Sequence, residues 1–323
     1  MAVPGGAYYS TYHGHDESYL KSIIASLRRS HGSDAAAIFL AGDSTLDNKH
    51  WLFRGGQSAQ SLIEDQTRGA FTAAAVNGYE AVLEPTVMVK DVCYWMNYEL
   101  ADKKVKSFVV NTAVEATTLT SRTGGFQCCC MPACGSLQAQ DELIRQNLTE
   151  RDYLVVSVGG NDIALAPSIC TVIALLTVMI TPWFLLGWLH PSVLYLQMIF
   201  RYQLQSYVKK LVENRKPAKI AVCMVYNLDE QNNQSWANSA LYCLCYHCAP
   251  GILQYRMRIA FELGVSKVKI PGVREVVPIH LADALDGKDT RDYVARVEPS
   301  IQGGRKIACL ILSKLGLIES KHV

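Results

Sequence analysis

A continuous apolar run, residues 38–41, ends in the small-residue turn Gly42-Asp43-Ser44. Such a run bounded by a turn is typical of a strand buried on both faces of a parallel sheet. Open α/β sheets place their chemistry at the carboxyl ends of the strands, and a serine hydroxyl fixed there can serve as a nucleophile. This feature therefore predicts an α/β protein with Ser44 at the reactive edge of its sheet.

A second strand end repeats the arrangement further along the chain. Residues 153–158 are mostly apolar and lead into Gly159-Gly160-Asn161-Asp162. The glycines allow an unusual backbone path, and Asn161 offers side-chain N–H donors. We expect the two polar strand ends to converge on one site.

Helical and strand patterns alternate along the rest of the chain. Apolar spacing predicts helices over residues 17–29, 58–76, 140–146, 201–214, 253–263 and 303–315. Apolar runs predict further strands over residues 105–110, 220–226 and 273–278. This alternation predicts an α/β fold with a mostly parallel sheet in three layers.

Length and charge restrict the function. A chain of 323 residues, half of them hydrophobic, can bury a large core, and we expect one decorated domain. With 31 basic and 29 acidic residues the net charge is +2, and no basic run is interleaved with aromatics, so nucleic-acid binding is not expected. The polar start of the chain shows no signal peptide, which predicts a cytoplasmic or peripherally membrane-associated protein.

The eleven cysteines are clustered and odd in number. Without a secretion signal this predicts mostly reduced thiols. Cys245 and Cys248 have a spacing found in zinc sites, and the triple cysteine 128–130 is a candidate for acylation, but neither cluster has a complete ligand pattern. We expect no metal and no cofactor.

Four segments together resemble the SGNH hydrolase superfamily, the GDSL-type esterases and lipases. They are Gly42-Asp43-Ser44, residues 111–118, Gly159-Gly160-Asn161-Asp162, and Glu298-Pro299-Ser300 with Gly303-Gly304, and they occur in the order of the superfamily's conserved blocks. The resemblance spans residues 38–312. It implies a three-layer α/β/α, flavodoxin-like fold and a serine acyl hydrolase.

The same resemblance assigns roles to residues. It implies that Ser44 is the nucleophile and that Asn161 and the backbone amides of Ser44 and Ala116 stabilise the oxyanion. Ala116 stands where the superfamily has glycine. At the position of the catalytic base the chain departs further from the superfamily pattern, because Glu298 replaces the histidine and Ala295 replaces its aspartate. A carboxylate is a weaker base than imidazole unless burial raises its pKa.

Three residues remain candidates for the base. Glu298 itself is one, provided that neither Arg296 nor Lys306 neutralises it. His280 follows a predicted strand and is an alternative base, and His50 lies six residues after Ser44. Asp43 and Asp162 are instead expected to order turns or cap helices.

Residues 168–200 form a long, nearly uncharged apolar segment. A single membrane span here would separate strands of one sheet, so we expect an apolar helical insertion within the domain. Two interpretations stay open: a helical pair buried against the core, or a lid in contact with a membrane.

These features predict residues 1–35 as an N-terminal helical lead-in and 36–323 as an SGNH-like domain. The leading function is a serine esterase or lipase-like acyl hydrolase of weak activity, acting on an acyl ester or lipid-like small molecule. The alternatives are a catalytically degenerate relative that binds such a ligand or a partner, and a membrane-associated scaffold.

Overall fold

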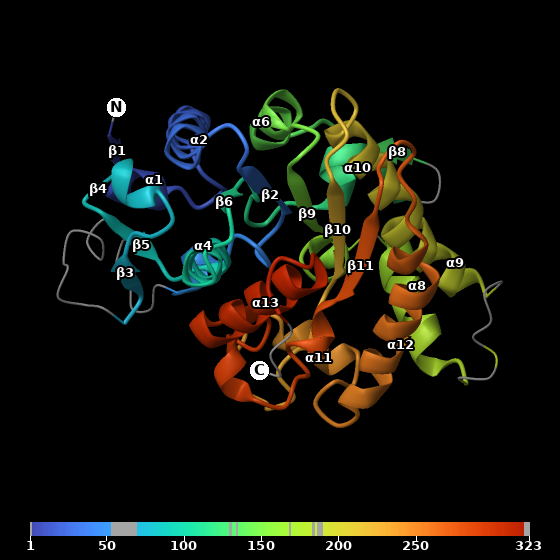
Figure 1. Cartoon of the computed structure of the whole chain (residues 1–323). Helices are drawn as coiled ribbons and strands as arrows, with labels where there is room; N and C mark the ends of the chain where they lie inside the picture. Colours follow the sequence, from blue (N-terminus) through green and yellow to red (C-terminus); the bar gives the residue numbers. More distant parts are fainter. Residues whose placement is uncertain are drawn as a thin grey trace.

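A parallel sheet of five strands forms the centre of the molecule (Figure 1). The computed structural model describes residues 2–52, 70–128, 131–133, 135–167, 169–182, 185 and 190–319. The strands of this sheet are β2 (Ala36–Gly42), β6 (Ser107–Asn111), β9 (Tyr153–Ser157), β10 (Lys219–Met224) and β11 (Val276–His280). All four pairings between them are parallel, which confirms the predicted sheet.

The strand order places two particular strand ends together. The order across the sheet is β11-β10-β9-β2-β6. Strand β2, the first of these strands along the chain, therefore lies between β6 and β9. This is the flavodoxin-like order, whose direction of winding changes between β2 and β9. Gly42 and Ser157 are register partners at that point. Ligands of open α/β sheets bind at this switch in winding.

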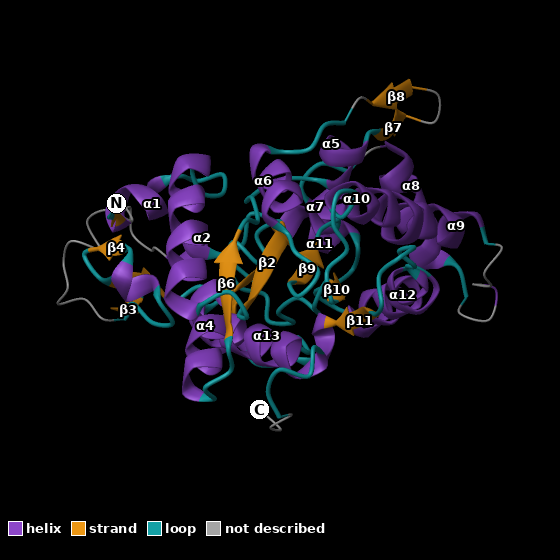
Figure 2. Ribbon diagram, turned by 45° about the horizontal axis from the view of Figure 1, so that its top comes forward, coloured by secondary structure: helices purple, strands orange, loops and turns teal. Residues whose placement is uncertain are grey.

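Helices cover both faces of the sheet (Figure 2). One face packs against α2 (Glu17–His31), α6 (Ala139–Asn147) and α10 (Leu204–Leu211), and the other against α4 (Val92–Asp102) and α13 (Ile301–Lys314). Alternate residues of β2 point to opposite sides, with Phe39 in the first core and Leu40 in the second. A strand buried on both faces explains why β2 is a continuous apolar run.

Most predicted helices are present within a few residues of their predicted ends. Helix α2 begins after Asp16, whose carboxylate accepts the Ser18 N–H at 2.8 Å. The predicted helix over residues 58–76 is the exception. Residues 53–69 lie outside the described part, and within the remainder β3 (Thr72–Ala74) pairs with β5 (Val87–Val89) as an antiparallel strand. That prediction is wrong over residues 72–74.

Short elements surround the central layers. They are β1 (Val3–Pro4), α1 (Gly5–Ser10), η1 (Lys49–Leu52), η2 (Tyr79–Ala81), β4 (Leu83–Glu84), α5 (Leu119–Thr123), β7 (Gly125–Cys128), β8 (Met131–Ala133), α7 (Gly160–Ala164), α11 (Asn238–Cys243), η5 (Val265–Lys267), η6 (Leu281–Asp283), η7 (Thr290–Asp292), β12 (Tyr293–Val294) and β13 (Glu298–Pro299).

The apolar insertion is a group of helices at one end of the molecule. It contains α8 (Ile169–Ile180), α9 (Pro191–Gln197) and the π-helical turn η4 (Met198–Gln203), and it packs against α12 (Pro250–Leu263) (Figures 1 and 2). Val178 and Val193 form a small core where these helices meet. Within the described ranges, no helix combines the length and the apolar character needed to cross a membrane.

Candidate active site

Ser44 lies in a tight turn directly after β2. The turn is closed by the N–H groups of Leu46 and Asp47, which both donate to the Asp43 carbonyl at 3.0 Å. Gly42 is required at its start, because a Cβ there would lie 1.8 Å from the Ser157 carbonyl oxygen. The close approach of β9 therefore sets the position from which Ser44 leaves the sheet.

Asn161 lies in the first turn of α7, after β9. Its side-chain Nδ2 donates to the Thr117 carbonyl at 2.9 Å. An amide nitrogen carries two hydrogens, so this bond orients the group and leaves a second donor. The neighbouring Asp162 accepts the N–H groups of Leu119 and Thr120 at 2.6 and 2.9 Å and thereby caps α5. The capping role predicted for Asp162 is present, on a helix that precedes it in the chain.

Ser44, Asn161 and Glu298 line one cavity of about 140 Å³. Its remaining wall is mainly apolar and comes from the segment after β10, from α11, α12 and the segments beside them; the residues include Val225, Tyr226, Trp236, Ala240, Leu241, Leu244, Leu253 and Met257. An apolar cavity with a few polar groups at one end is the usual form of a small-molecule site. Two polar strand ends thus meet in one cavity, and Glu298 lies there with them.

Glu298 is buried beside the serine, and its side chain is only 5% exposed. Burial raises the pKa of its carboxyl to about 8, with a smaller contribution from the nearby charge of Asp43. A hydrogen bond with the Ser44 side chain acts in the opposite direction and lowers that pKa. The serine and the carboxyl therefore lie close together in a dry environment.

The cations close to Glu298 in sequence are engaged elsewhere. Arg296 donates to the Asn238 side chain at 2.8 Å and to the Asp229 carbonyl at 3.2 Å. Lys306 donates to Asp292 at 2.8 Å. No salt bridge to Glu298 occurs among the described residues. Within the described part of the chain, its carboxyl is thus not paired with an arginine or lysine.

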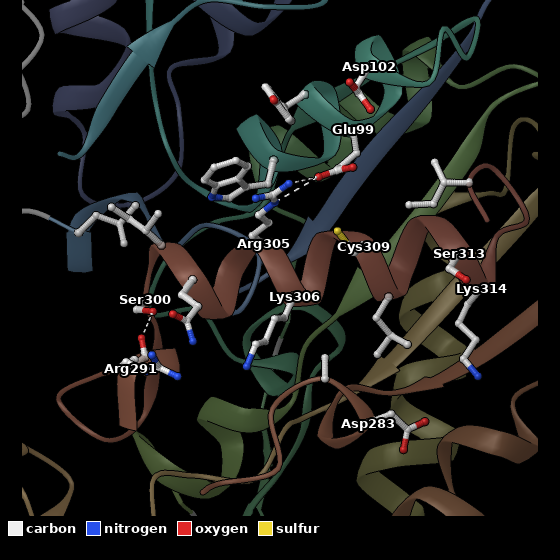
Figure 3. Close-up of a pocket in the computed structure, with 18 of the residues that line it drawn as sticks. Glu99, Asp102, Asp283, Arg291, Ser300, Arg305, Lys306, Cys309, Ser313 and Lys314 are labelled. Atoms are coloured by element: carbon white, nitrogen blue, oxygen red, sulfur yellow. Dashed lines mark hydrogen bonds and ion pairs between the residues drawn. The ribbon is translucent and has the colours of Figure 1, made fainter. Parts of the chain in front are cut away.

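A larger groove runs along the outer side of α13 (Figure 3). Its volume is about 1570 Å³, and charged side chains such as Glu99, Arg305 and Lys306 line it. Arg305 extends toward α4, where it donates to Glu99 at 2.9 Å, and it stacks over the ring of Trp95. Because neither Ser44 nor Asn161 lines this groove, the chemistry is assigned to the smaller cavity.

Glu115 is a buried carboxyl that sequence reasoning did not single out, and it lies outside the residues that line the cavity. It is buried, its Oε1 accepts the Trp51 indole N–H at 2.9 Å, and its Oε2 has no hydrogen-bond partner among the residues described. Burial, followed by the charges of Glu298 and Asp47, raises the pKa of Glu115 to about 9. A carboxylate directly before Ala116, in a segment otherwise free of charge, was the available signal. Ala116 itself adopts a positive φ of 58°.

The histidine candidates occupy other places. His280 ends β11, the edge strand separated from β2 by two intervening strands, which corresponds to roughly 14 Å. It lies 3.8 Å from Asp283 and packs against Phe261. His50 is nearer the site, in edge-on contact with Tyr12 at 4.4 Å between ring centroids. The structure brings neither histidine into the cavity that holds Ser44.

Two residues after the serine turn connect the separate segments of the site. Asn48 donates to the Pro299 carbonyl and accepts the Val92 N–H, both at 3.1 Å. Asp47 accepts the Glu115 N–H at 3.4 Å and is held by Lys49 at 2.7 Å. The turn that carries Ser44 therefore also positions the backbone of both glutamates.

The cysteines follow the prediction in part. Cys93, Cys223, Cys243, Cys245, Cys248 and Cys309 are free thiols. Cys170 is disulfide-bonded, which corrects the expectation of reduced thiols at that position.

Comparison with known proteins gives structural similarities alone. No family model matches the sequence, and no curated protein matches it. The solved structures that resemble it include a protein from Parabacteroides merdae described as a GDSL-like lipase, at 14% identity and a TM-score of 0.44 over 88% of this chain and 97% of that one. An acetylxylan esterase from Geobacillus stearothermophilus has 14% identity and a TM-score of 0.43, again over 88% and 97%. A carbohydrate acetylesterase from Sinorhizobium meliloti has 11% identity and a TM-score of 0.38 over 87% and 98%.

Proposed function

We propose that this chain is an SGNH-type serine acyl hydrolase in which Ser44 is the nucleophile and Glu298 the general base. The observation that carries the proposal is that Ser44 and the buried carboxyl of Glu298 line the same cavity at the switch point of the sheet. A nucleophilic serine needs an adjacent base, and this carboxyl is the one that shares its cavity.

The proposed reaction uses the groups in that cavity. The Ser44 Oγ attacks the ester carbonyl carbon while its proton passes to Glu298, and the carbonyl π electrons move onto the oxygen. The second N–H of Asn161 and the backbone N–H groups of Ser44 and Ala116 stabilise that oxyanion. The intermediate then collapses, the alkoxide leaves with the proton, and water repeats the sequence on the acyl-enzyme.

The raised pKa of Glu298 makes this reaction depend on pH. Below about pH 8 the carboxyl is largely protonated and cannot accept the serine proton. Above that pH it is ionised, and it is then a much stronger base than an ordinary carboxylate. We therefore expect low activity at neutral pH that increases as the pH rises through 8.

The cavity favours an apolar acyl group. Its volume of about 140 Å³ is close to that of a protein cavity of about 150 Å³ that holds benzene. An acyl chain of up to about six carbons is therefore the expected substrate portion.

The labelling of Ser44 by a fluorophosphonate tests the proposal. Wild-type protein should be labelled at pH 8.5 but only slowly at pH 6, and Ser44→Ala should not be labelled at all. Glu298→Gln should lose at least 10³-fold in labelling rate, in the range found when a catalytic base is removed. Ser121→Ala, a serine on the surface of α5, is the matched control and should be labelled normally. Unlabelled, correctly folded wild type at every pH would favour the alternative, a non-catalytic protein that binds an acyl ligand.

We also propose that the apolar end of the molecule contacts a lipid surface. Residues 163–200 and 231–255 contain no Asp, Glu, Lys or Arg, and the helices that they form pack together. Ile173, Leu176 and Ile180 of α8 are exposed, at 59%, 44% and 82%. Trp236 lines the cavity and is itself 44% exposed. An uncharged surface with exposed aliphatic and aromatic side chains matches hydrocarbon and interfacial lipid.

A further inference from the structure

A second side-chain amide borders the Ser44 cavity, on the side formed by α12. Leu253 and Gln254 lie four and three residues before Met257 on this helix, so the three side chains share one face, and all three line the cavity. Leucine and methionine offer a ligand only apolar contact. Gln254 is therefore the polar group that this face of α12 presents to a bound molecule.

The orientation of the Gln254 amide is determined by its nitrogen. Nε2 donates to Glu230 Oε1 at 2.9 Å and to the Tyr246 hydroxyl oxygen at 3.2 Å. An ionised carboxylate can only accept hydrogen bonds. The Tyr246 O–H is itself donated to the Leu228 carbonyl at 2.6 Å, so its oxygen is left to accept from Gln254. Both hydrogens of the amide nitrogen are thus used.

The surroundings keep the amide in this orientation. Tyr246 is only 1% exposed, and the Glu230 N–H donates to the Gly287 carbonyl at 2.9 Å, so both partners of the amide nitrogen are held in place. A Cβ on Gly287 would lie 3.2 Å from Gln254 Nε2, which shows how closely the amide packs against this backbone. An amide held in this way keeps the same atom available to a ligand.

The amide oxygen is the atom that remains for a ligand. Within the described part of the chain, Gln254 Oε1 accepts no hydrogen bond, and it is not sealed off from solvent. Asn161 has the opposite chemistry, because its remaining N–H can only donate. The cavity therefore offers a donor at the serine end and an acceptor on the α12 side.

We propose that Gln254 is a specificity-determining residue of the Ser44 cavity, and that the substrate is an ester whose short apolar acyl chain carries a hydroxyl group that donates to Gln254 Oε1. This inference rests on the proposed function, in which Ser44 attacks an ester held in this cavity. A plain acyl chain would displace water from Oε1 and leave it unpaired, which lowers the affinity of that chain. A hydroxyl is a compact donor and brings no carbonyl that would itself need a partner.

Binding to a form of the protein that cannot cleave the ligand tests the proposal. In Ser44→Ala, NMR titration measures the dissociation constants of methyl hexanoate and of its 3-, 5- and 6-hydroxy derivatives. At least one hydroxy ester should bind at least threefold more tightly than methyl hexanoate. Adding Gln254→Leu should reduce this ratio of affinities at least fivefold, because the acceptor is gone.

A matched variant and the plain ester serve as controls. Gln231→Leu makes the same substitution at an exposed glutamine outside the cavity and should leave the ratio unchanged. Methyl hexanoate should still bind to Gln254→Leu, which shows that the variant is folded; if it does not, Gln254→Met, with an unbranched side chain, takes its place. An unchanged ratio, or tighter binding of methyl hexanoate than of every hydroxy ester before Gln254 is replaced, would overturn the proposal.

The outcome for Gln254 is separate from the outcome for catalysis. Discrimination that depends on Gln254, in a protein whose Ser44 is never labelled by a fluorophosphonate, would support this binding group and contradict the hydrolase function. Labelling of Ser44 without such discrimination would contradict only the role of Gln254.

Discussion

At the scale of single residues, the burial of the Glu298 carboxyl lowers the free energy of unfolding as the pH rises above 4.5. Its carboxyl has an ordinary pKa of 4.5 in the unfolded chain and about 8 in the folded protein. Between these values the folded state holds a proton that the unfolded state has released, so the free energy of unfolding falls as the pH rises. Buried carboxyls that serve as bases commonly impose such a cost.

Glu298→Gln should therefore remove part of the pH dependence of the free energy of unfolding. Wild type should lose about 1.4 kcal/mol of stability per pH unit from this group between pH 5 and 8, whereas the amide does not titrate. Urea unfolding of both proteins at pH 5, 6.5 and 8 measures the difference, with Glu150→Gln as a surface control. Parallel stability curves for wild type and Glu298→Gln would show that the carboxyl is not held neutral by burial.

Sequence reasoning could single out Ser44, Asn161 and Glu298 as candidates because each belongs to a local motif. Glu115 carries no such motif, and its buried place beside Trp51 depends on a residue that is distant in the chain. The failure at Glu115 is thus a failure to foresee long-range neighbours. The same limitation left Arg296 and Lys306 as open partners of Glu298, because only the folded structure shows that they bind Asn238 and Asp292.

At the scale of elements, the close approach of the end of β2 to β9 depends on the absence of a side chain at Gly42. Gly42→Ala would place its Cβ 1.8 Å from the Ser157 carbonyl oxygen, so the two strands must separate. We expect a loss of about 3 kcal/mol or more in the free energy of unfolding, together with loss of labelling. In Gly251→Ala, on α12, the new Cβ meets nothing within 4 Å, and the change should be neutral or stabilise by up to about 1 kcal/mol. Equal stabilities of the two variants in urea would contradict this account of the strand end.

Asn48 connects the serine turn to α4 and β13. Asn48→Ala leaves the Pro299 carbonyl and the Val92 N–H unpaired in the interior, which should cost about 2–4 kcal/mol. Labelling should decrease as well, because the strand that carries Glu298 loses an anchor. Asn214→Ala removes one exposed hydrogen bond of 3.4 Å and should change the stability by less than about 0.5 kcal/mol. Urea unfolding and labelling of the two variants would decide whether Asn48 has this connecting role.

Helices and strands with a clear spacing of apolar residues were predictable from the sequence, and those without one were not. The strands of the central sheet are apolar runs because both faces are buried, and amphipathic helices such as α2 show one apolar side. Helix α4 was missed because it is buried on several sides. Its buried residues include the polar Asn97, so its sequence shows no single apolar stripe. The strand at residues 72–74 lay inside an apparent helical pattern, and its pairing with β5 is a tertiary contact that local spacing does not report.

At the scale of the whole molecule, the strand order explains why the candidate site lies where it does. Alternating helices and strands imply a parallel sheet, but they do not determine which strands are neighbours. The observed order makes β2 and β9 adjacent at the switch in winding, so the ends that carry Ser44 and Asn161 face the same cavity. Convergence of the two motifs could be expected from the sequence, whereas the apolar wall from α11 and α12 required the fold.

The uncharged end of the molecule leads to a prediction about the whole protein. If the exposed face of α8 contacts lipid, wild-type protein should float with phosphatidylcholine vesicles in a density gradient, and raising the salt concentration should not release it, because no charged residue contributes from residues 163–200. Ile173→Glu places a charge on that face and should reduce flotation at least tenfold. Ala25→Glu places the same charge on an exposed position of α2 and should float like wild type.

The oligomeric state in the absence of vesicles distinguishes lipid contact from self-association of the protein. A second copy of the chain could cover the same apolar face, and Ile173→Glu would then convert a dimer to a monomer in analytical ultracentrifugation. Flotation of a monomeric wild-type protein supports a lipid surface as the partner of α8. A stable wild-type dimer that does not float would instead assign the uncharged face to self-association, and the acyl substrate would then have to reach Ser44 from solution.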